Sequence, residues 1–165
     1  MSKRMVVQQR FKGKKVLVTG ANGGIGSVLA ASLKKEGALV AVTDLDTSNI
    51  KADVHFDGDL LDSSFCDFLP SRVAKHFNDI DILFNNAGVI TRGKITDTSE
   101  EDYSLTMGVN VEAPFRLCRA VIPLMKPGSS IVNTASCWGL RPGPEHPLYV
   151  MSKASIASLT QCLGL

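Results

Sequence analysis

Short runs of β-branched and aliphatic residues alternate along this chain with longer segments of helical spacing, and this alternation limits the possible folds more than any other feature. The runs lie at residues 15–19, 39–43, 54–56, 80–84 and 130–134. Because the runs are almost continuously apolar, we expect a parallel sheet that helices cover on both faces. Right-handed crossovers between such strands make a doubly wound sheet of the α/β class.

Helical spacing between these strands predicts the covering helices. The first helix should end near Gly37, a typical glycine after a C-terminus, and its apolar stripe is formed by Ile25, Val28, Leu29 and Leu33. Further helices are expected over residues 62–77 and 99–125, and from near Leu148 to the end of the chain. The third begins with an acidic turn, which suits the positive end of a helix dipole.

The length of the chain, 165 residues, allows one domain with a core of its own. We divide it into a basic N-terminal arm, residues 1–14, and one domain, residues 15–165. The arm is interpreted as a solvated tail, with a targeting or anion-binding arm as the alternative. The net charge of +2 gives no sign of a nucleic-acid partner, and no apolar run is long enough to span a bilayer.

Cysteine and histidine positions argue against a metal site. The 3 histidines form no cluster. The 4 cysteines are not spaced as metal ligands are; they are Cys66, Cys118, Cys137 and Cys162. We interpret the cysteines as small buried hydrophobic residues in a reducing compartment, which favours a cytoplasmic protein.

A glycine-rich loop, TGANGGIG at residues 19–26, directly follows the first predicted strand and opens the first helix. Glycine permits the sharp turn, and the missing side chains let a pyrophosphate approach the helix N-terminus, where free N–H groups favour an anion. An acid, Asp44, ends the second strand about 20 residues further on, where a carboxylate can accept hydrogen bonds from ribose hydroxyls. A turn-forming role at a strand end is the alternative for Asp44.

Further motifs follow in a fixed order, each at a predicted strand end or helix. They are Asp59-Leu60, the NNAG sequence at residues 85–88, Asn110, Ser136 and the YVMSK sequence at residues 149–153. In this order the motifs resemble those of the short-chain dehydrogenase/reductase family. The resemblance implies a Rossmann fold that binds NAD(P) and an enzyme that interconverts a secondary alcohol and a ketone by hydride transfer.

The resemblance also implies the site residues. The catalytic positions are Asn110, Ser136, Tyr149 and Lys153. The cofactor-binding positions are Gly20, Asn22, Gly24, Ile25, Gly26, Asp44, Asp59, Leu60, Asn86, Ala87, Gly88, Tyr149 and Lys153. Relatives that prefer NADP often carry a basic residue where this chain has Asn22, and Asp44 would repel a 2′-phosphate, so we expect NAD rather than NADP.

The chemistry explains why these residue types are needed. Tyr149 and Lys153 are four residues apart and lie on one helix face. An ammonium beside a phenol favours the phenolate, so Tyr149 could take the alcohol proton or return it. Ser136 would hydrogen-bond the substrate oxygen, and Asn110 would hold a water that links Lys153 to solvent. Taken singly, Ser136 could instead be a helix cap, Asn110 a buried polar residue and Tyr149 a surface tyrosine.

The chain also departs from the resemblance. Family members usually continue beyond Leu165 with two more strands and a substrate lid, so we expect a C-terminally truncated domain with little turnover of its own. A non-catalytic nucleotide-binding remnant is the alternative, and a nucleotide-sugar epimerase is a lesser one. The resemblance also implies a homo-oligomer of the complete protein through the helices that carry Asn110 and Tyr149. On the last helix, apolar residues recur at Ile156, Leu159 and Leu163. By analogy with the family, four residues between Ser136 and Tyr149 could line a substrate pocket: Trp138, Leu140, His146 and Leu148. A place in the core is the alternative for Trp138 and Leu140.

Overall fold

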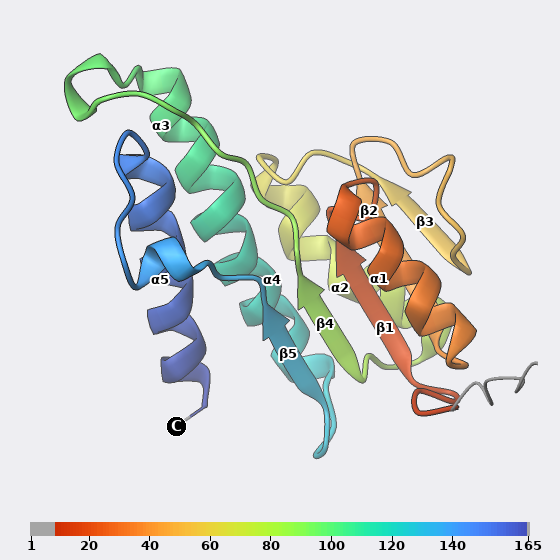
Figure 1. Cartoon of the computed structure of the whole chain (residues 1–165). Coiled ribbons are helices and arrows are strands. Elements are labelled where there is room, and N and C mark those ends of the chain that lie inside the picture. Colours follow the sequence, from red (N-terminus) through yellow and green to blue (C-terminus); the bar gives the residue numbers. More distant parts are fainter. Residues whose placement is uncertain (1–8, 165) are drawn as a thin grey trace, which may run out of the picture.

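Five parallel strands form the centre of the structure, a computed structural model that describes residues 9–164 (Figure 1). They are β1 (Lys15–Thr19), β2 (Leu39–Asp44), β3 (Val54–Asp57), β4 (Ile82–Asn85) and β5 (Ser130–Asn133). Their order in the sheet is β3-β2-β1-β4-β5. The chain builds outward from β1 to β3 and then crosses back to β4, so the strand order reverses between β1 and β4. This is the predicted doubly wound α/β fold.

Helices connect the strands, and polar side chains cap two of them. The α-helices are α1 (Gly24–Lys35), α2 (Ser63–Phe77), α3 (Glu100–Met107), α4 (Ala113–Val121) and α5 (Pro147–Leu163). Three short 3₁₀ turns are η1 (Ile95–Asp97), η3 (Ile122–Leu124) and η4 (Cys137–Gly139). Asp62 caps α2 by accepting from the main-chain N–H groups of Ser64 and Phe65, and Ser99 caps α3 in the same way. These local caps explain why α2 and α3 begin close to the predicted residues 62 and 99.

The long helix predicted over residues 99–125 is interrupted. A single π-helical turn, η2 (Gly108–Glu112), separates α3 from α4, and it carries Asn110 and Val109 into the interior. Such turns insert an extra residue into a helix and are common at functional sites. The last helix, predicted to continue to the end of the chain, ends at Leu163 with Gly164 as its C-cap, and Leu165 lies outside the described residues.

Alternate residues of the central strands are buried on opposite faces of the sheet. Leu17 of β1 packs in a cluster with α2 and α4, whereas its neighbours Val16 and Val18 pack on the face that α1 covers. Burial on both faces therefore holds for the interior strands. It does not hold for β5, where Val132 is 42% exposed. The strand lies at the edge of the sheet, beyond the reach of α1 (Figure 1).

The buried face of α1 differs from the predicted stripe. Ile25 and Val28 are 69% and 65% exposed, whereas the buried residues are Gly26, Ala30 and Leu33. Small residues are buried at the start of α1 because the helix begins directly after the glycine loop and lies close against it. A Cβ atom on Gly26 would lie only 2.0 Å from the Gly20 carbonyl oxygen.

The predicted N-terminal arm lies partly outside the described residues, which begin at residue 9. Its last part, residues 10–14, folds against the end of α1. The Phe11 N–H donates to the Glu36 carbonyl (3.2 Å), and the Gly13 N–H donates to the Gly37 carbonyl (2.9 Å). Arg10 forms an ion pair with the Glu36 carboxylate.

The cysteines divide into two pairs. Cys66 and Cys118 are buried as predicted, but Cys137 and Cys162 are exposed, and all four are free thiols. The prediction of four buried cysteines was wrong for the last two, which lie in the less covered part of the fold around β5 and α5. Within residues 9–164, no group of histidine, cysteine and acidic side chains is placed to hold a metal ion. No helix in that range has the length and apolarity needed to cross a membrane.

Candidate functional site

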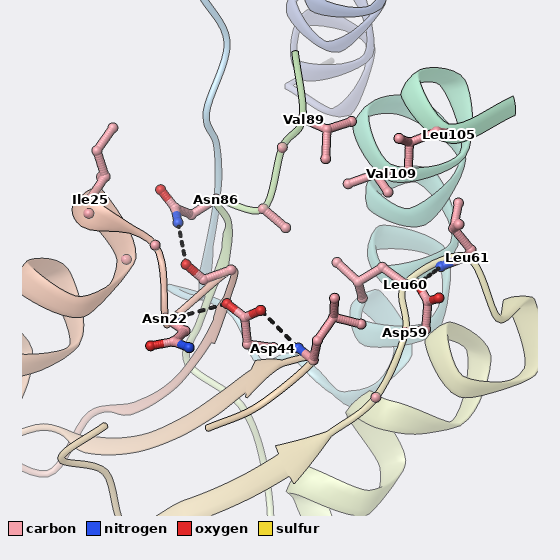
Figure 2. Close-up of a pocket in the computed structure, with 18 residues that line it drawn as sticks. Asn22, Ile25, Asp44, Asp59, Leu60, Leu61, Asn86, Val89, Leu105 and Val109 are labelled. Carbon is pink, nitrogen blue, oxygen red and sulfur yellow. Dashed lines mark hydrogen bonds between the residues drawn. The ribbon is translucent and has the colours of Figure 1, made fainter. Parts of the chain in front are cut away.

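A cleft of about 610 Å³ opens at the carboxyl ends of the central strands, where the strand order reverses (Figure 2). Open α/β sheets bind ligands at this kind of position. Every predicted cofactor residue lines the cleft except Tyr149 and Lys153. Sequence analysis missed the other lining residues, which are Gly23, Leu45, Gly58, Leu61, Val89, Leu105 and Val109.

The glycine loop forms the floor of one end of the cleft. Gly20 has a φ of +64°, and a Cβ atom there would lie 2.6 Å from the Ala87 Cα. In contrast, a Cβ on Gly24, the first residue of α1, would meet nothing within 4 Å. The loop is thus closed on the protein side and open on the cleft side at the N-terminus of α1. Its free N–H groups can receive a phosphate group there.

Asp44 ties the glycine loop to the end of β2. Its carboxylate accepts from the Asn22 N–H through Oδ2 (2.8 Å) and from the Leu45 N–H through Oδ1 (2.8 Å) (Figure 2). Each carboxylate oxygen keeps a further lone pair. Asp44 can therefore hold the loop and still accept hydrogen bonds from a hydroxyl group in the cleft.

Asn86 ties the loop to β4 on the opposite side. Its Nδ2 donates to the carbonyl oxygens of Thr19 (3.1 Å) and Gly20 (3.2 Å). The Thr19 hydroxyl in turn accepts from the N–H groups of Asn86 and Ala87, each at 3.1 Å. The ends of β1 and β4 are therefore fixed to each other by side chains as well as by the strand ladder.

The far end of the cleft is apolar. Leu60 and Leu61 follow β3 and face Leu105 and Val109, which come from α3 and η2 (Figure 2). The Asp59 carboxylate accepts from the Leu61 N–H at 2.9 Å, which holds this turn in place. The spacing of four residues between Leu105 and Val109, on the helix that carries Asn110, was the sequence signal that could have found this wall.

Lys153 lies at the centre of the predicted catalytic group. It is only 4% exposed, and its Nζ donates to the Thr134 carbonyl at 2.7 Å. Burial lowers the pKa of Lys153 from its usual value, because the charged form loses hydration. Nζ lies 5.8 Å from the centre of the Tyr149 ring. The structure thus brings the lysine charge to one side of the tyrosine.

Asn110 connects η2 with both the cleft and α5. Its Oδ1 accepts from the Val89 N–H (2.8 Å), and its Nδ2 donates to the Val89 carbonyl (2.9 Å) and to the Ser152 hydroxyl (3.0 Å). Because Gly88 has no side chain, Asn110 Oδ1 and Lys153 Nζ can both lie close to its main chain. A Cβ atom there would lie 3.2 Å from Lys153 Nζ and 3.3 Å from Asn110 Oδ1.

Ser136 precedes η4, and its Oγ accepts from the Trp138 N–H at 3.2 Å. The η4 turn packs tightly on α5, since a Cβ atom on Gly139 would lie 2.7 Å from the Lys153 carbonyl carbon. The structure therefore places Ser136 on the segment beside α5. Within residues 9–164 no hydrogen bond joins the Ser136 and Tyr149 hydroxyl groups, which leaves the Ser136 hydroxyl proton available for another acceptor.

The matches to known proteins agree with this arrangement. The family model described as short chain dehydrogenase matches residues 14–165. An uncharacterized oxidoreductase of Thermotoga maritima is 36% identical, over 94% of this chain and 66% of its own length. The chain therefore spans about two thirds of that relative.

Solved structures show the same fold. A short chain dehydrogenase from Burkholderia cenocepacia in complex with NADP superposes with a TM-score of 0.87 at 33% identity, covering 93% of this chain and 68% of that one. A relative from Burkholderia phymatum in complex with NAD has a TM-score of 0.85 at 28% identity, with 93% and 59% covered. Either dinucleotide is thus found on this fold.

Proposed function

Because this chain belongs to the short-chain dehydrogenase/reductase family, we propose that it binds NAD(H) and serves hydride transfer between a secondary alcohol and a ketone. The observation that supports this most is the junction at Gly88, where Lys153 Nζ and Asn110 Oδ1 converge at the end of the dinucleotide cleft. When bound, the nicotinamide supplies or accepts the hydride. The remaining steps depend on the side chains of this chain.

Binding would divide between the two ends of the cleft. The N-terminus of α1, which is open at Gly24, would receive the pyrophosphate. Asp44 would accept the adenosine ribose hydroxyls, and the apolar wall around Leu60 would hold the adenine. A 2′-phosphate beside the Asp44 carboxylate would bring two negative charges together, so we propose NAD as the preferred cofactor.

Proton transfer would take place at the Tyr149 hydroxyl. The hydroxyl would take a proton from an alcohol and return it to a ketone oxygen, with Lys153 Nζ 5.8 Å from the centre of the Tyr149 ring. Ser136 would donate a hydrogen bond to the substrate oxygen and stabilise charge that develops there. Asn110, held by Val89 and Ser152, would help to place a water between Lys153 and solvent.

Self-association is the second part of the proposal. An apolar groove of about 330 Å³ between α4 and α5 includes Met107, Phe115 and Leu159, and Phe115 is 50% exposed. Ile156, which the sequence pattern assigned to this face, is buried inside the chain. We propose that the groove contacts a second copy in a homo-oligomer. With four free thiols, the protein suits a reducing compartment such as the cytoplasm.

Cofactor preference is tested by calorimetric titration of the chain with NAD⁺ and with NADP⁺. We expect tighter binding of NAD⁺, and we expect Asp44→Ala to weaken it about tenfold or more, the usual cost of losing a hydrogen bond to a charged group. The affinity for NADP⁺ should fall less, so the difference in affinity between NAD⁺ and NADP⁺ becomes smaller. Asp46→Ala is the control, because Asp46 is exposed and does not line the cleft. Tighter binding of NADP⁺ by the parent chain would contradict the preference.

The proton-transfer role is tested by Tyr149→Phe. Turnover is followed through NADH absorbance with a panel of alcohols and ketones, using this chain joined to the part of the Thermotoga maritima relative beyond the match. Removing only the acid–base hydroxyl should lower turnover by about 10²- to 10⁴-fold and leave NADH affinity almost unchanged. Tyr103→Phe, on the exposed surface of α3, is the control. Cofactor binding without turnover of any substrate by the parent would favour the non-catalytic alternative.

A further inference from the structure

Three aromatic rings form a continuous array between Ser136 and α5. The Trp138 indole stacks on the His146 imidazole, with ring centres 4.7 Å apart and planes inclined by 25°. The same indole meets the Tyr149 ring edge-on, with centres 6.1 Å apart and planes at 83°. Both geometries are the arrangements that aromatic pairs prefer. The Trp138 indole therefore packs against both the proposed acid–base residue and His146.

The segment that carries this array is anchored to its surroundings. His146 Nδ1 lies 3.3 Å from the Thr91 carbonyl and donates to it, and the Gly93 N–H donates to the Glu145 carbonyl at 2.9 Å. Glu145 itself adopts a left-handed backbone conformation with φ of 60°, which a non-glycine residue keeps only when its surroundings hold it. Residues 137–147 are thus attached to the segment that follows Gly88, and His146 is fixed at one end of the array.

The other neighbours of the indole leave it little room. A Cβ atom on Gly143 would lie 3.1 to 3.4 Å from three carbons of the indole, so the main chain passes close to the ring. The Trp138 N–H is held by Ser136 Oγ at 3.2 Å. Since both the main chain and the ring of Trp138 are restrained, its contact with Tyr149 can restrain the tyrosine in turn.

We propose that His146 and Trp138 are positioning residues, which together fix the orientation of the Tyr149 ring. The proposal rests on the proposed function for its catalytic meaning, since the orientation sets where the Tyr149 hydroxyl meets a substrate oxygen. His146 acts through the indole, and Lys153, whose Nζ lies 5.8 Å from the Tyr149 ring centre, supplies the charge rather than the orientation. A proton donor must be held close to its productive geometry, because small displacements cost large factors in rate.

The test compares two substitutions of His146 by NMR of the chain labelled with ¹³C-tyrosine. His146→Asn removes the stacked ring, keeps a donor for the Thr91 carbonyl and suits the N-cap position that His146 occupies before α5. His146→Phe keeps a stacked ring and loses the donor. The chain has only 2 tyrosines, so Tyr103 serves as an internal reference in every spectrum. His76→Ala, which removes an α2 imidazole from its edge contact with Phe56 of β3, is the matched control.

The indole ring current displaces the Tyr149 ring signals from those of free tyrosine. We expect His146→Asn to remove most of that displacement, His146→Phe to keep it, and His76→Ala to change neither tyrosine. Unchanged Tyr149 signals in His146→Asn would overturn the proposal. Equal changes in both His146 variants would also overturn it, because they would assign the effect to the hydrogen bond with Thr91. If His146→Asn does not fold, Gly143→Ala displaces the indole by contact and must move the same signals.

Turnover separates this proposal from the function on which it rests. In the extended protein described above, His146→Asn should lower kcat severalfold and leave NADH affinity unchanged. His146→Phe should keep a kcat close to that of the parent. A loss of NADH affinity equal to the loss of kcat would overturn the positioning role. Tyr149 signals that depend on His146 in a protein without any turnover would support the array and contradict the proposed function instead.

Discussion

The two parts of the candidate site are built in different ways. The cleft end, at β1, the glycine loop and β2, is made of main chain and glycine, on strands whose interior residues are fully buried. The proposed catalytic end, residues 130–164, is made of side chains on an edge strand and on α5, whose buried residues include the polar Ser152 and Lys153. At the first end, ligand binding would depend on the position of the backbone. At the second, side chains must be held by other side chains.

This difference has a physical consequence. The inner side of the glycine loop has no room for added volume, because a Cβ atom on Gly20 would meet Ala87 and one on Gly26 would meet Gly20. Side-chain sites tolerate volume changes better but depend on chains of contacts, such as those of Asn110 with Val89 and Ser152. We therefore expect substitutions at the two ends to differ in their effect on stability.

The largest expected effect is that of Gly26→Ala. The new methyl group would lie 2.0 Å from the Gly20 carbonyl oxygen, so the loop or α1 must shift. We expect a loss of roughly 3 kcal/mol in the free energy of unfolding, measured in urea, together with a loss of cofactor binding. Gly24→Ala is the control for stability, since a Cβ atom there meets nothing and helix propensity favours alanine. Equal stability of the two variants would remove the distinction between the inner and outer sides of the loop.

A smaller effect is expected when the same atoms are removed from the two ends. Val18→Ala in β1 deletes fully buried methyl groups and should cost about 2 kcal/mol, combining lost burial with a cavity. Val132→Ala in β5 deletes groups that are 42% exposed and should cost about 0.5 kcal/mol. Urea unfolding of both variants measures the difference. Equal losses would mean that β5 is as well covered as β1.

The smallest effect concerns the thiols and should leave stability unchanged. Burial raises the pKa of Cys66 to about 11 and also raises that of Cys118, because the thiolate loses hydration. At pH 8 iodoacetamide should therefore modify only Cys137 and Cys162, the exposed pair at the catalytic end. Mass spectrometry of native and urea-unfolded samples counts the modified sites. Native modification of Cys66 below pH 9 would contradict the burial of α2 against the sheet.

Much of the site was predictable because the motifs lie at strand ends. Parallel strands bring their carboxyl ends to one edge of the sheet, so a glycine loop after β1, an acid after β2 and the NNAG sequence after β4 must meet there. The almost continuously apolar runs also predicted strands buried on both faces, as β1 and β2 are. The helix starts predicted near residues 62 and 99 are capped in the structure by Asp62 and Ser99, and such caps depend only on neighbouring residues.

The errors have one common origin. Apolar spacing in α1 predicted Ile25 and Val28 as the buried stripe, but the close approach of the loop selected Gly26 and Ala30. The π-helical turn at Asn110 and the exposed Cys137 were also missed. In each case the outcome depends on segments far away in sequence, which local patterns do not contain.

The sequence by itself therefore determined the fold class, the family and the place of the cleft, because these depend on the order and period of residues along the chain. Only the tertiary structure decided which partner each polar group meets. It joined Asp44 to Asn22, brought Lys153 and Asn110 to Gly88, and placed Trp138 between His146 and Tyr149. Such contacts are set by packing across the fold, where volume and hydrogen-bond geometry choose among partners that the local sequence leaves equivalent.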